Sequence, residues 1–479
     1  MIARWCVALV GLATAAAMPR VAAAQRPDTV SLADAIAEAL ERNPTVRQAG
    51  AAVRAADGRV REAWAMALPD VNASASYQRN FMVQEQIFEF NGEVIRARFG
   101  FENNWVAGVT VSQPLFQADV LIGVGAAGRY RAWERERARG TAQRVVTDVR
   151  QAYFAALAQL ELARLNETAV ERIRATLEET RGRFRAGLTS EYDVLRFEVE
   201  LANLEPQLRR ARDGFAAAKR ALLIAMGRPA DGDIEVEGRL SEVNVLEPDR
   251  NTPDNARLLA LSGPMLDAGA LDTAYVSALA ARSDVRQAQL GITVEEARLK
   301  VERAQLFPTI SLFGAYTLYA QDPGSPSFFG GSPDYRSSAA WGGVRIEVPV
   351  FRGFRESARM QQARASIAQN QAQLDFAREQ TASDLRTLGA ALDETRSRVA
   401  SQARAVAQAR RGYEIATVEY REGLGSQLQV TDAELALRES EYNYALAVFD
   451  HLTARANLDA ALGTVPDATD MAAAWAVNN

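Results

Sequence analysis

Few residues of this chain have the types and spacing that chemistry requires. Residues 123–128 read GVGAAG, which fits the Gly-x-Gly-x-x-Gly pattern of dinucleotide-binding loops, and Asp148 follows where a ribose-binding carboxylate would stand. That pattern binds a cofactor only where it joins a strand to a helix within a βαβ unit. Here it lies inside a long helical segment that has no such unit around it. We therefore predict no dinucleotide site and no cofactor.

Metal ligands and nucleophiles are equally scarce. The 479 residues include one histidine, His451, and one cysteine, Cys6. Zinc sites use three or four such ligands, so the sequence predicts no metal site. The aspartates and glutamates are spread along helical segments beside arginines, which is typical of solvated surface. We predict that the protein is not an enzyme and has no catalytic residues.

The first 24 residues have the features of a secretory signal peptide. Arg4 precedes an apolar stretch from Trp5 to Ala17, and the following VAAAQ predicts cleavage after Ala24. Cys6 lies in this leader and no lipobox surrounds a cleavage point, so we expect a mature protein with no disulfide and no lipid anchor. Removal of Arg4 and Arg20 changes the formal charge from −5 to −7, which argues against nucleic acid as a partner.

After residue 24 there is no apolar run of the ~18 residues that a transmembrane helix needs. Two possibilities remain. The protein is soluble outside the cytoplasm, or it crosses a membrane with β-strands, whose signal is alternation.

The mature sequence is a tandem duplication. RAGLTSEYDVL (185–195) returns as REGLGSQLQVT (421–431), within an ungapped alignment of 184–227 to 420–463. Matches at similar offsets precede it in the same order: NPTVRQA (43–49) with RSDVRQA (282–288), and GVTVSQPLF (108–116) with GVRIEVPVF (343–351). Each half is therefore one structural repeat.

Helical segments dominate both repeats. A medium helix (45–67, and 284–306 in the second repeat) precedes the strands, and a long helix (118–185, and 353–421) follows them. The long helices are rich in strong helix formers, and about 68 residues at ~1.5 Å each predict a length of ~100 Å. After a Gly-containing turn the chain returns as a second helix to Gly227 or Gly463. Pro206 is expected to kink or break the first return helix.

Two strands in each repeat carry an alternating pattern. They are predicted at 69–82 and 101–116, and at 308–321 and 339–350, with connecting loops at 83–100 and 322–338. In the first strand the apolar face holds Val71, Ala73, Ala75 and Tyr77, and the polar face holds Asn72, Ser74, Ser76 and Gln78. A four-stranded sheet would leave two exposed edges. We therefore expect several chains to pool their strands into one barrel, above a wall of long helices.

This plan resembles the TolC family of outer-membrane efflux proteins over nearly the whole mature length. The resemblance rests on the duplicated order of elements, on the opening SLADAIAEALERNP (31–44), and on the Gly-x-x-Ser turns at 187–190 and 423–426. It implies a mainly α fold with a transmembrane β-barrel part, in which a homotrimer builds a 12-strand barrel in outer-membrane lipid and a 12-helix periplasmic tunnel. It also implies a passive exit duct for efflux or type I secretion, partnered by a periplasmic adaptor and, through it, an inner-membrane pump.

The same resemblance implies roles for residues at the two turns, which would form the periplasmic tip of the tunnel. The residues expected to contact the adaptor are Gly187, Leu188, Thr189, Ser190, Gly423, Leu424, Gly425 and Ser426. A hydrogen bond between Tyr420 and Asp193 would latch the gate. TolC itself adds an arginine where this chain has Gly425, and lines its aperture with aspartates at the positions of Gln429 and Asp432. We expect one acidic ring per trimer, and therefore a looser gate and weaker block by cations than at a tip with two acidic rings.

The implied organisation places an equatorial linker at 228–270 between the repeats 25–227 and 271–463, with a C-terminal tail at 464–479. The alternative is a periplasmic coiled-coil adaptor or scaffold. An adaptor would have a single hairpin, and a scaffold would not need four alternating strands. The transported substrate, the class of pump and the geometry of adaptor docking are not determined by the sequence.

Overall fold

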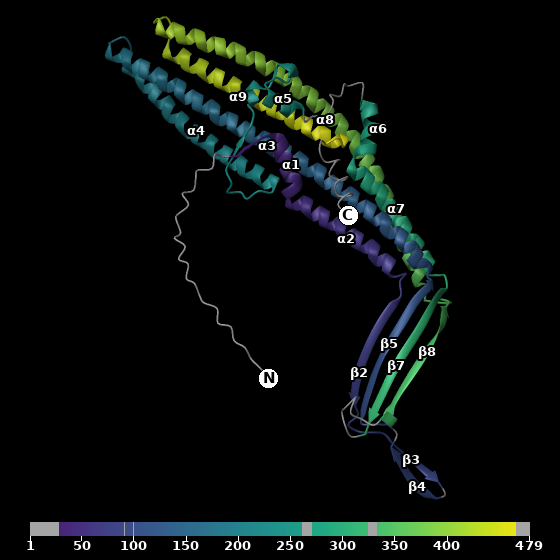
Figure 1. Ribbon diagram of the computed structural model, residues 1–479. Helices are drawn as coiled ribbons and strands as arrows, with labels where there is room; N and C mark the ends of the chain where they lie inside the picture. Colours follow the sequence, from purple (N-terminus) through teal and green to yellow (C-terminus); the bar gives the residue numbers. More distant parts are fainter. Residues whose placement is uncertain (1–27, 91, 99, 261–270, 324–332, 466–479) are drawn as a thin grey trace, which may run out of the picture.

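The computed structural model describes residues 28–465 except 91, 99, 261–270 and 324–332. The predicted signal peptide and almost all of the predicted tail lie outside these residues. A body of long helices ends in a four-stranded sheet, and the two repeats lie side by side along the whole length (Figure 1). None of the described helices combines the length and the apolar character needed to cross a membrane.

Two long helical hairpins form the body. The first consists of α3 (Ala118–Arg185) and α4 (Glu191–Met226), and the second of α8 (Arg355–Arg421) and α9 (Gln427–Leu462). Because α3 packs against both α4 and α9, the helices are arranged in the order α4, α3, α9, α8. The 68 residues of α3 span about 100 Å.

Pro206 does not break the return helix, so the predicted break is wrong. It lies inside the continuous helix α4. A proline within a helix removes one backbone hydrogen bond and crowds the preceding turn. Leu204 and Ala211, on either side of it, are buried, and α4 packs along α3. Packing against the neighbouring helix therefore offsets the local cost of the proline.

The shorter helices brace this body. Helix α2 (Pro44–Ala65) packs against α3, and α7 (Ser283–Ala304) packs between α3 and α8. Helix α1 (Leu32–Arg42) begins with a capping box between Ser31 and Asp34, and α6 (Leu271–Ala281) contacts α8 and α9.

The main hydrophobic core lies near the middle of the helical body, where the linker between the repeats also packs. Strand β1 (Asp28–Val30) pairs in parallel with β6 (Ile234–Val236), and the hydroxyl of Tyr153 on α3 lies 3.0 Å from the carbonyl oxygen of Val30. The linker, whose fold the sequence did not reveal, also contains two short 3₁₀ turns (Leu240–Glu242 and Pro248–Arg250) and α5 (Pro253–Ala260).

The sheet takes two strands from each repeat. Its order is β2 (Asp70–Arg79), β5 (Asn103–Phe116), β7 (Thr309–Asp322) and β8 (Arg336–Glu347), and all neighbours are antiparallel. The central pair, β5 and β7, joins the two repeats. A short 3₁₀ turn (Pro333–Tyr335) precedes β8. The register places Val71 opposite Val111 and Tyr77 opposite Trp105, so the predicted apolar residues of the first strand share one face with those of the second.

The loop predicted at 83–100 contains a β-hairpin, which corrects that prediction. Strands β3 (Glu85–Phe90) and β4 (Glu93–Arg98) pair antiparallel and extend beyond the sheet (Figure 1). The sequence carried the signal, because an Asn-Gly pair at 91–92 joins two short alternating segments, and Gly92 has φ +82°.

A buried ion pair joins the two hairpins near the main core. Arg150 of α3 and Asp459 of α9 are each about 1% exposed, and their charged groups lie 2.9 Å apart. Removing one partner of a buried pair is costly, because the other charge stays in a region of low polarity.

We expect Asp459→Ala to lower the free energy of unfolding by about 3–5 kcal/mol, because it withdraws the carboxylate from buried Arg150. The matched control is Glu414→Ala, which breaks the exposed pair between Glu414 and Arg411 and should cost less than about 1 kcal/mol. Denaturant unfolding of the detergent-solubilised protein measures both, and equal losses would contradict the assignment.

Candidate gate and docking site at the hairpin tips

The two hairpins turn at the end of the body that lies farthest from the sheet (Figure 1). Gly187 and Gly423 have φ of +75° and +76°, a conformation that residues with a side chain rarely adopt. After each glycine a leucine amide closes the helix end: Leu188 N–H donates to the carbonyl of Arg183 at 2.9 Å, and Leu424 N–H to that of Glu419 at 2.8 Å. The duplicated sequence therefore makes the same helix end twice.

The returning helices begin with the same capping box. Ser190 accepts a hydrogen bond from the Asp193 amide, and the Asp193 carboxylate accepts one from the Ser190 amide at 3.2 Å. Ser426 and Gln429 repeat the arrangement, with the side-chain oxygen of Gln429 2.6 Å from the Ser426 amide nitrogen. Two residues predicted at the gate therefore also stabilise the starts of α4 and α9.

Asp193 has further donors. Burial raises the pKa of its carboxyl, but hydrogen bonds from the hydroxyls of Thr189 (2.6 Å) and Ser190 (2.8 Å) outweigh that effect, so the pKa lies below its ordinary value. The charged form of Asp193 is thus bound within its own turn.

The tips present two large apolar side chains to solvent. Leu188 is 70% exposed and Leu424 is 83% exposed. Of the other residues predicted to contact an adaptor, Gly187, Ser190, Gly423 and Ser426 are exposed, and Thr189 and Gly425 are half-buried. A single exposed leucine needs no explanation, but here a leucine is exposed at the equivalent position of both tips, so the tips present a matched pair of apolar side chains.

Tyr420 joins the two hairpins directly behind the tips. Its hydroxyl lies 3.3 Å from that of Thr180 on α3, and its ring packs edge-to-face against Phe197 of α4. The guanidinium of Arg183 lies 5.2 Å from the centre of the same ring. Tyr420 is buried and belongs to the apolar cluster between the hairpins.

The structure therefore assigns Tyr420 and Asp193 to different partners, and the predicted direct hydrogen bond between them is not formed in it. Asp193 is satisfied by its own turn, and the Tyr420 hydroxyl faces Thr180. Gln429 and Asp432 are exposed on α9. The gating roles of these four residues stay predictions. Sequence analysis missed Thr180 and Arg183, because nothing in the sequence says which face of α3 meets α8.

Two polar contacts reinforce this junction. Arg183 of α3 donates to the backbone carbonyl of Arg421 at 2.7 Å, and Arg421 in turn pairs with Glu179 at 3.3 Å. These side chains are wholly or partly exposed, so each contact is worth little by itself. Together with Tyr420 they fix the relative position of the two tips.

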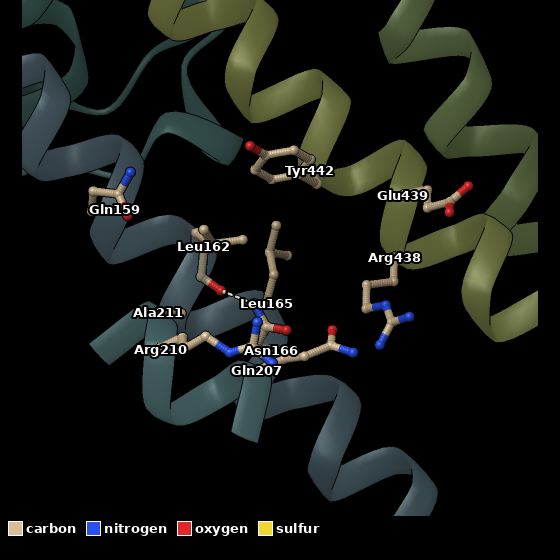
Figure 2. A pocket seen from close by; sticks show the side chains of 10 residues that line it. All are labelled: Gln159, Leu162, Leu165, Asn166, Gln207, Arg210, Ala211, Arg438, Glu439 and Tyr442. Atoms are coloured by element: carbon tan, nitrogen blue, oxygen red, sulfur yellow. Dashed lines mark hydrogen bonds between the residues drawn. The ribbon is translucent and has the colours of Figure 1, made fainter. Parts of the chain in front are cut away.

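Farther from the tips the contact between the hairpins is polar and loosely packed. A cavity of about 420 Å³ opens between α3, α4 and α9, and the side chains of Gln207 and Arg438 extend toward it (Figure 2). Its lining is completed by Gln159, Leu162, Leu165, Asn166, Arg210, Ala211, Glu439 and Tyr442.

Glu434 is a buried carboxyl at this contact. It is about 1% exposed, and one of its oxygens has no hydrogen-bond partner among the described residues. Burial is the largest effect and raises the pKa of the Glu434 carboxyl. The positive charges of Arg438 and Arg172 lower this pKa, and the negative charges of Glu200 and Glu441 raise it. As a result the pKa lies above its ordinary value. The packed arrangement therefore favours the protonated form.

Comparisons with known proteins agree with this geometry. The family model described as outer membrane efflux protein matches residues 35–228 and 274–464, which lie in the two repeats. Protein CyaE of Bordetella pertussis is 28% identical over 361 residues, which cover 74% of this chain and 67% of CyaE. The alkaline protease secretion protein AprF of Pseudomonas aeruginosa is 24% identical over 76% of this chain and 71% of AprF. The CmeC outer membrane channel of Campylobacter jejuni superposes with a TM-score of 0.70 at 15% identity, covering 93% of this chain and 89% of CmeC.

The raised pKa of Glu434 predicts a dependence of stability on pH. Its favourable contribution is complete below the ordinary pKa of 4.5 and is lost as the pH rises through the raised value. We expect Glu434→Gln to raise the thermal unfolding midpoint relative to the parent protein at pH 8 and to change it little at pH 4.

Glu198 is the control for this prediction, because it occupies the equivalent position in the first repeat and pairs with Arg181 at 2.7 Å. Glu198→Gln should give no gain at pH 8. A gain from Glu434→Gln that is the same at pH 4 and pH 8 would show that its buried charge is not the cause.

Proposed function

Because the chain belongs to the outer membrane efflux protein family, we propose that three copies assemble one continuous duct, a 12-strand barrel followed by a 12-helix tunnel. Membership confirms the predicted family, the outer-membrane location and the role as an exit duct. The members of this family and the structural relatives of this chain are channels, and we propose that this protein likewise has no enzymatic activity.

The observation that carries the trimeric barrel is the open sheet. Strands β2 and β8 are its edges, and both leave backbone N–H and C=O groups unpaired. The four strands alternate in direction, so β8 of one copy would meet β2 of the next antiparallel. Closed barrels of this kind have an even number of antiparallel strands, and three copies supply twelve. Closure removes every edge.

The two faces of the sheet differ as such a barrel requires. Val71, Val109, Tyr316 and Val344 lie on one face and are 60%, 42%, 50% and 58% exposed in the single chain. Side chains of this type are stable against lipid and costly in water. The opposite face carries mainly small and hydroxyl-bearing residues, and we propose that it lines the lumen.

The helical hairpins have matching free sides. In the order α4, α3, α9, α8, the outermost helices are α4 and α8, which would meet between neighbouring copies. Near the tip, α4 exposes Tyr192, Leu195 and Val199 at helical spacing, and α8 exposes Ile415 and Val418. Mutual burial of these side chains supports a closed ring of twelve helices.

At the tip, we propose that the contact of Tyr420 with Thr180 holds the two hairpins of each copy together and so narrows the tunnel. Asp432 and Gln429 are exposed on α9, where three copies would place one ring of carboxylates and one of amides. Compared with an aperture that has two rings of carboxylates, the ring of amides lowers the negative charge and the attraction for multivalent cations.

The exposed Leu188 and Leu424 suit docking of a helical periplasmic adaptor, which would connect the duct to an inner-membrane pump. The name of AprF describes secretion of a protease, and the family name describes efflux. We propose the same general role here, with cargo selected by the pump.

The mass of the detergent-extracted protein tests the assembly. Light scattering after size exclusion should give a protein mass equal to three mature chains. The protein should be recovered from the membrane fraction only with detergent. A monomer recovered from the soluble periplasm would contradict the shared barrel.

A variant of Tyr420 tests the gate. Tyr420→Phe keeps the ring and removes the hydroxyl that faces Thr180, which should cost the narrowed state about 1 kcal/mol per copy. We expect a higher single-channel conductance in planar bilayers. Tyr413→Phe, on the same helix, is the control and should not change the conductance. An unchanged conductance for Tyr420→Phe would show that this contact does not hold the gate.

A further inference from the structure

An aromatic and cationic cluster lies on the face of the sheet that carries mainly small and polar side chains. The register places Ala315 opposite Trp341, Phe313 opposite Gly343 and Ser311 opposite Arg345. Because alternate residues share a face, Phe313, Trp341 and Arg345 point to the same side. Elsewhere this face carries mainly small or polar side chains such as Asn72, Ser74, Ser76, Thr110 and Thr317, together with the cross-strand pair Val106 and Tyr319.

The three side chains form one packed unit. The rings of Phe313 and Trp341 meet edge-to-face with 5.6 Å between their centres, and the guanidinium of Arg345 lies 5.0 Å from the centre of the Phe313 ring. Gly343 makes room for this arrangement, since a Cβ there would lie 3.1 Å from the Phe313 ring. The position of Phe313 is therefore fixed by its neighbours.

Unlike Phe313, Trp341 and Arg345 are not enclosed by packing. Trp341 is 56% exposed, so much of its indole remains open beside Phe313. Arg345 is also exposed, and among the described residues no carboxylate lies within ion-pair distance of it. The exposed indole and the guanidinium flank the Phe313 ring, four residues apart on β8, so one elongated ligand that lies across this ring can stack on the indole and accept a charge-assisted hydrogen bond from the guanidinium.

We propose that Trp341 and Arg345 form a contact site for aromatic anions in the lumen of the barrel. This inference rests on the proposed function, which places this face inside and brings three copies of the cluster to one level. An aromatic ring of a passing solute stacks on the indole, and its carboxylate or sulfonate pairs with the guanidinium. The site is shallow and exposed, so it slows such solutes rather than retaining them.

Planar bilayers with the purified full-length protein test the site, with 2-naphthoate as the probe and cyclohexanecarboxylate as an aliphatic acid of the same charge. We expect 2-naphthoate to reduce the current at lower concentrations than the aliphatic acid. Trp341→Leu and Arg345→Gln should each weaken that block about 5-fold, the size expected for one stacking or cation contact. Arg345→Gln should also shift the reversal potential toward cation selectivity.

The control variant is Tyr316→Leu, which removes an exposed ring of the opposite face and should leave the block unchanged. If the channel conducts but 2-naphthoate blocks Trp341→Leu and Arg345→Gln as strongly as the parent protein, the proposed contact site is wrong and the proposed duct is unaffected. If all variants and the parent protein form no channel, the shared barrel fails, and with it the lumen that the site requires.

Discussion

Backbone hydrogen bonding at the edges of the sheet is the constraint on which the rest of this structure depends. Within the four strands of one chain, only backbone N–H and C=O groups that point toward a neighbouring strand form hydrogen bonds. The edge strands β2 and β8 each have one side without a neighbouring strand in the described part of the chain. Such groups need water or another strand. In a lipid environment water is absent, and in the proposed barrel the strands of other copies supply the partners. The outer two helices of the body, α4 and α8, lie on the same sides as the open edges, so one assembly would complete both parts.

The contact between the two repeats combines apolar clusters with buried polar groups. It is anchored by the buried pair Arg150 and Asp459 near the main core, and by Tyr420 at the tips. Between them lie the cavity and Glu434, one of whose carboxylate oxygens has no hydrogen-bond partner among the described residues. Buried polar contacts specify one arrangement without necessarily adding stability. An interface that is fixed near the core and at the tips, with a cavity between the two contacts, suits a gate that must open without separating the repeats.

Duplication explains the repeated tips but not their differences. Both tips keep the left-handed glycine, the exposed leucine and the serine cap, because each is required by the turn itself. Residues behind the tips have diverged between the repeats. Phe184 corresponds to Tyr420, and Arg181 to Thr417, so that Glu198 has an arginine partner whereas the equivalent Glu434 has none at that position. The two tips therefore differ in their side chains at these positions.

The sequence by itself determined the repeat, the long helices, the four strands with their apolar and polar faces, and the tip turns. Each of these follows from local rules: helix propensity, alternation, and the conformational freedom of glycine. The sequence also contained the Asn-Gly signal of the β3–β4 hairpin, which was overlooked. Only the tertiary structure decided that α4 continues through Pro206, that Tyr420 faces Thr180, and that Glu434 is buried between two hairpins. These outcomes depend on which helix faces meet, and helices this long, rich in alanine and charged residues, carry no pattern that fixes their rotation. The partners of Asp193 were settled by its own turn, where the hydroxyls of Thr189 and Ser190 are nearer than any residue of the second repeat.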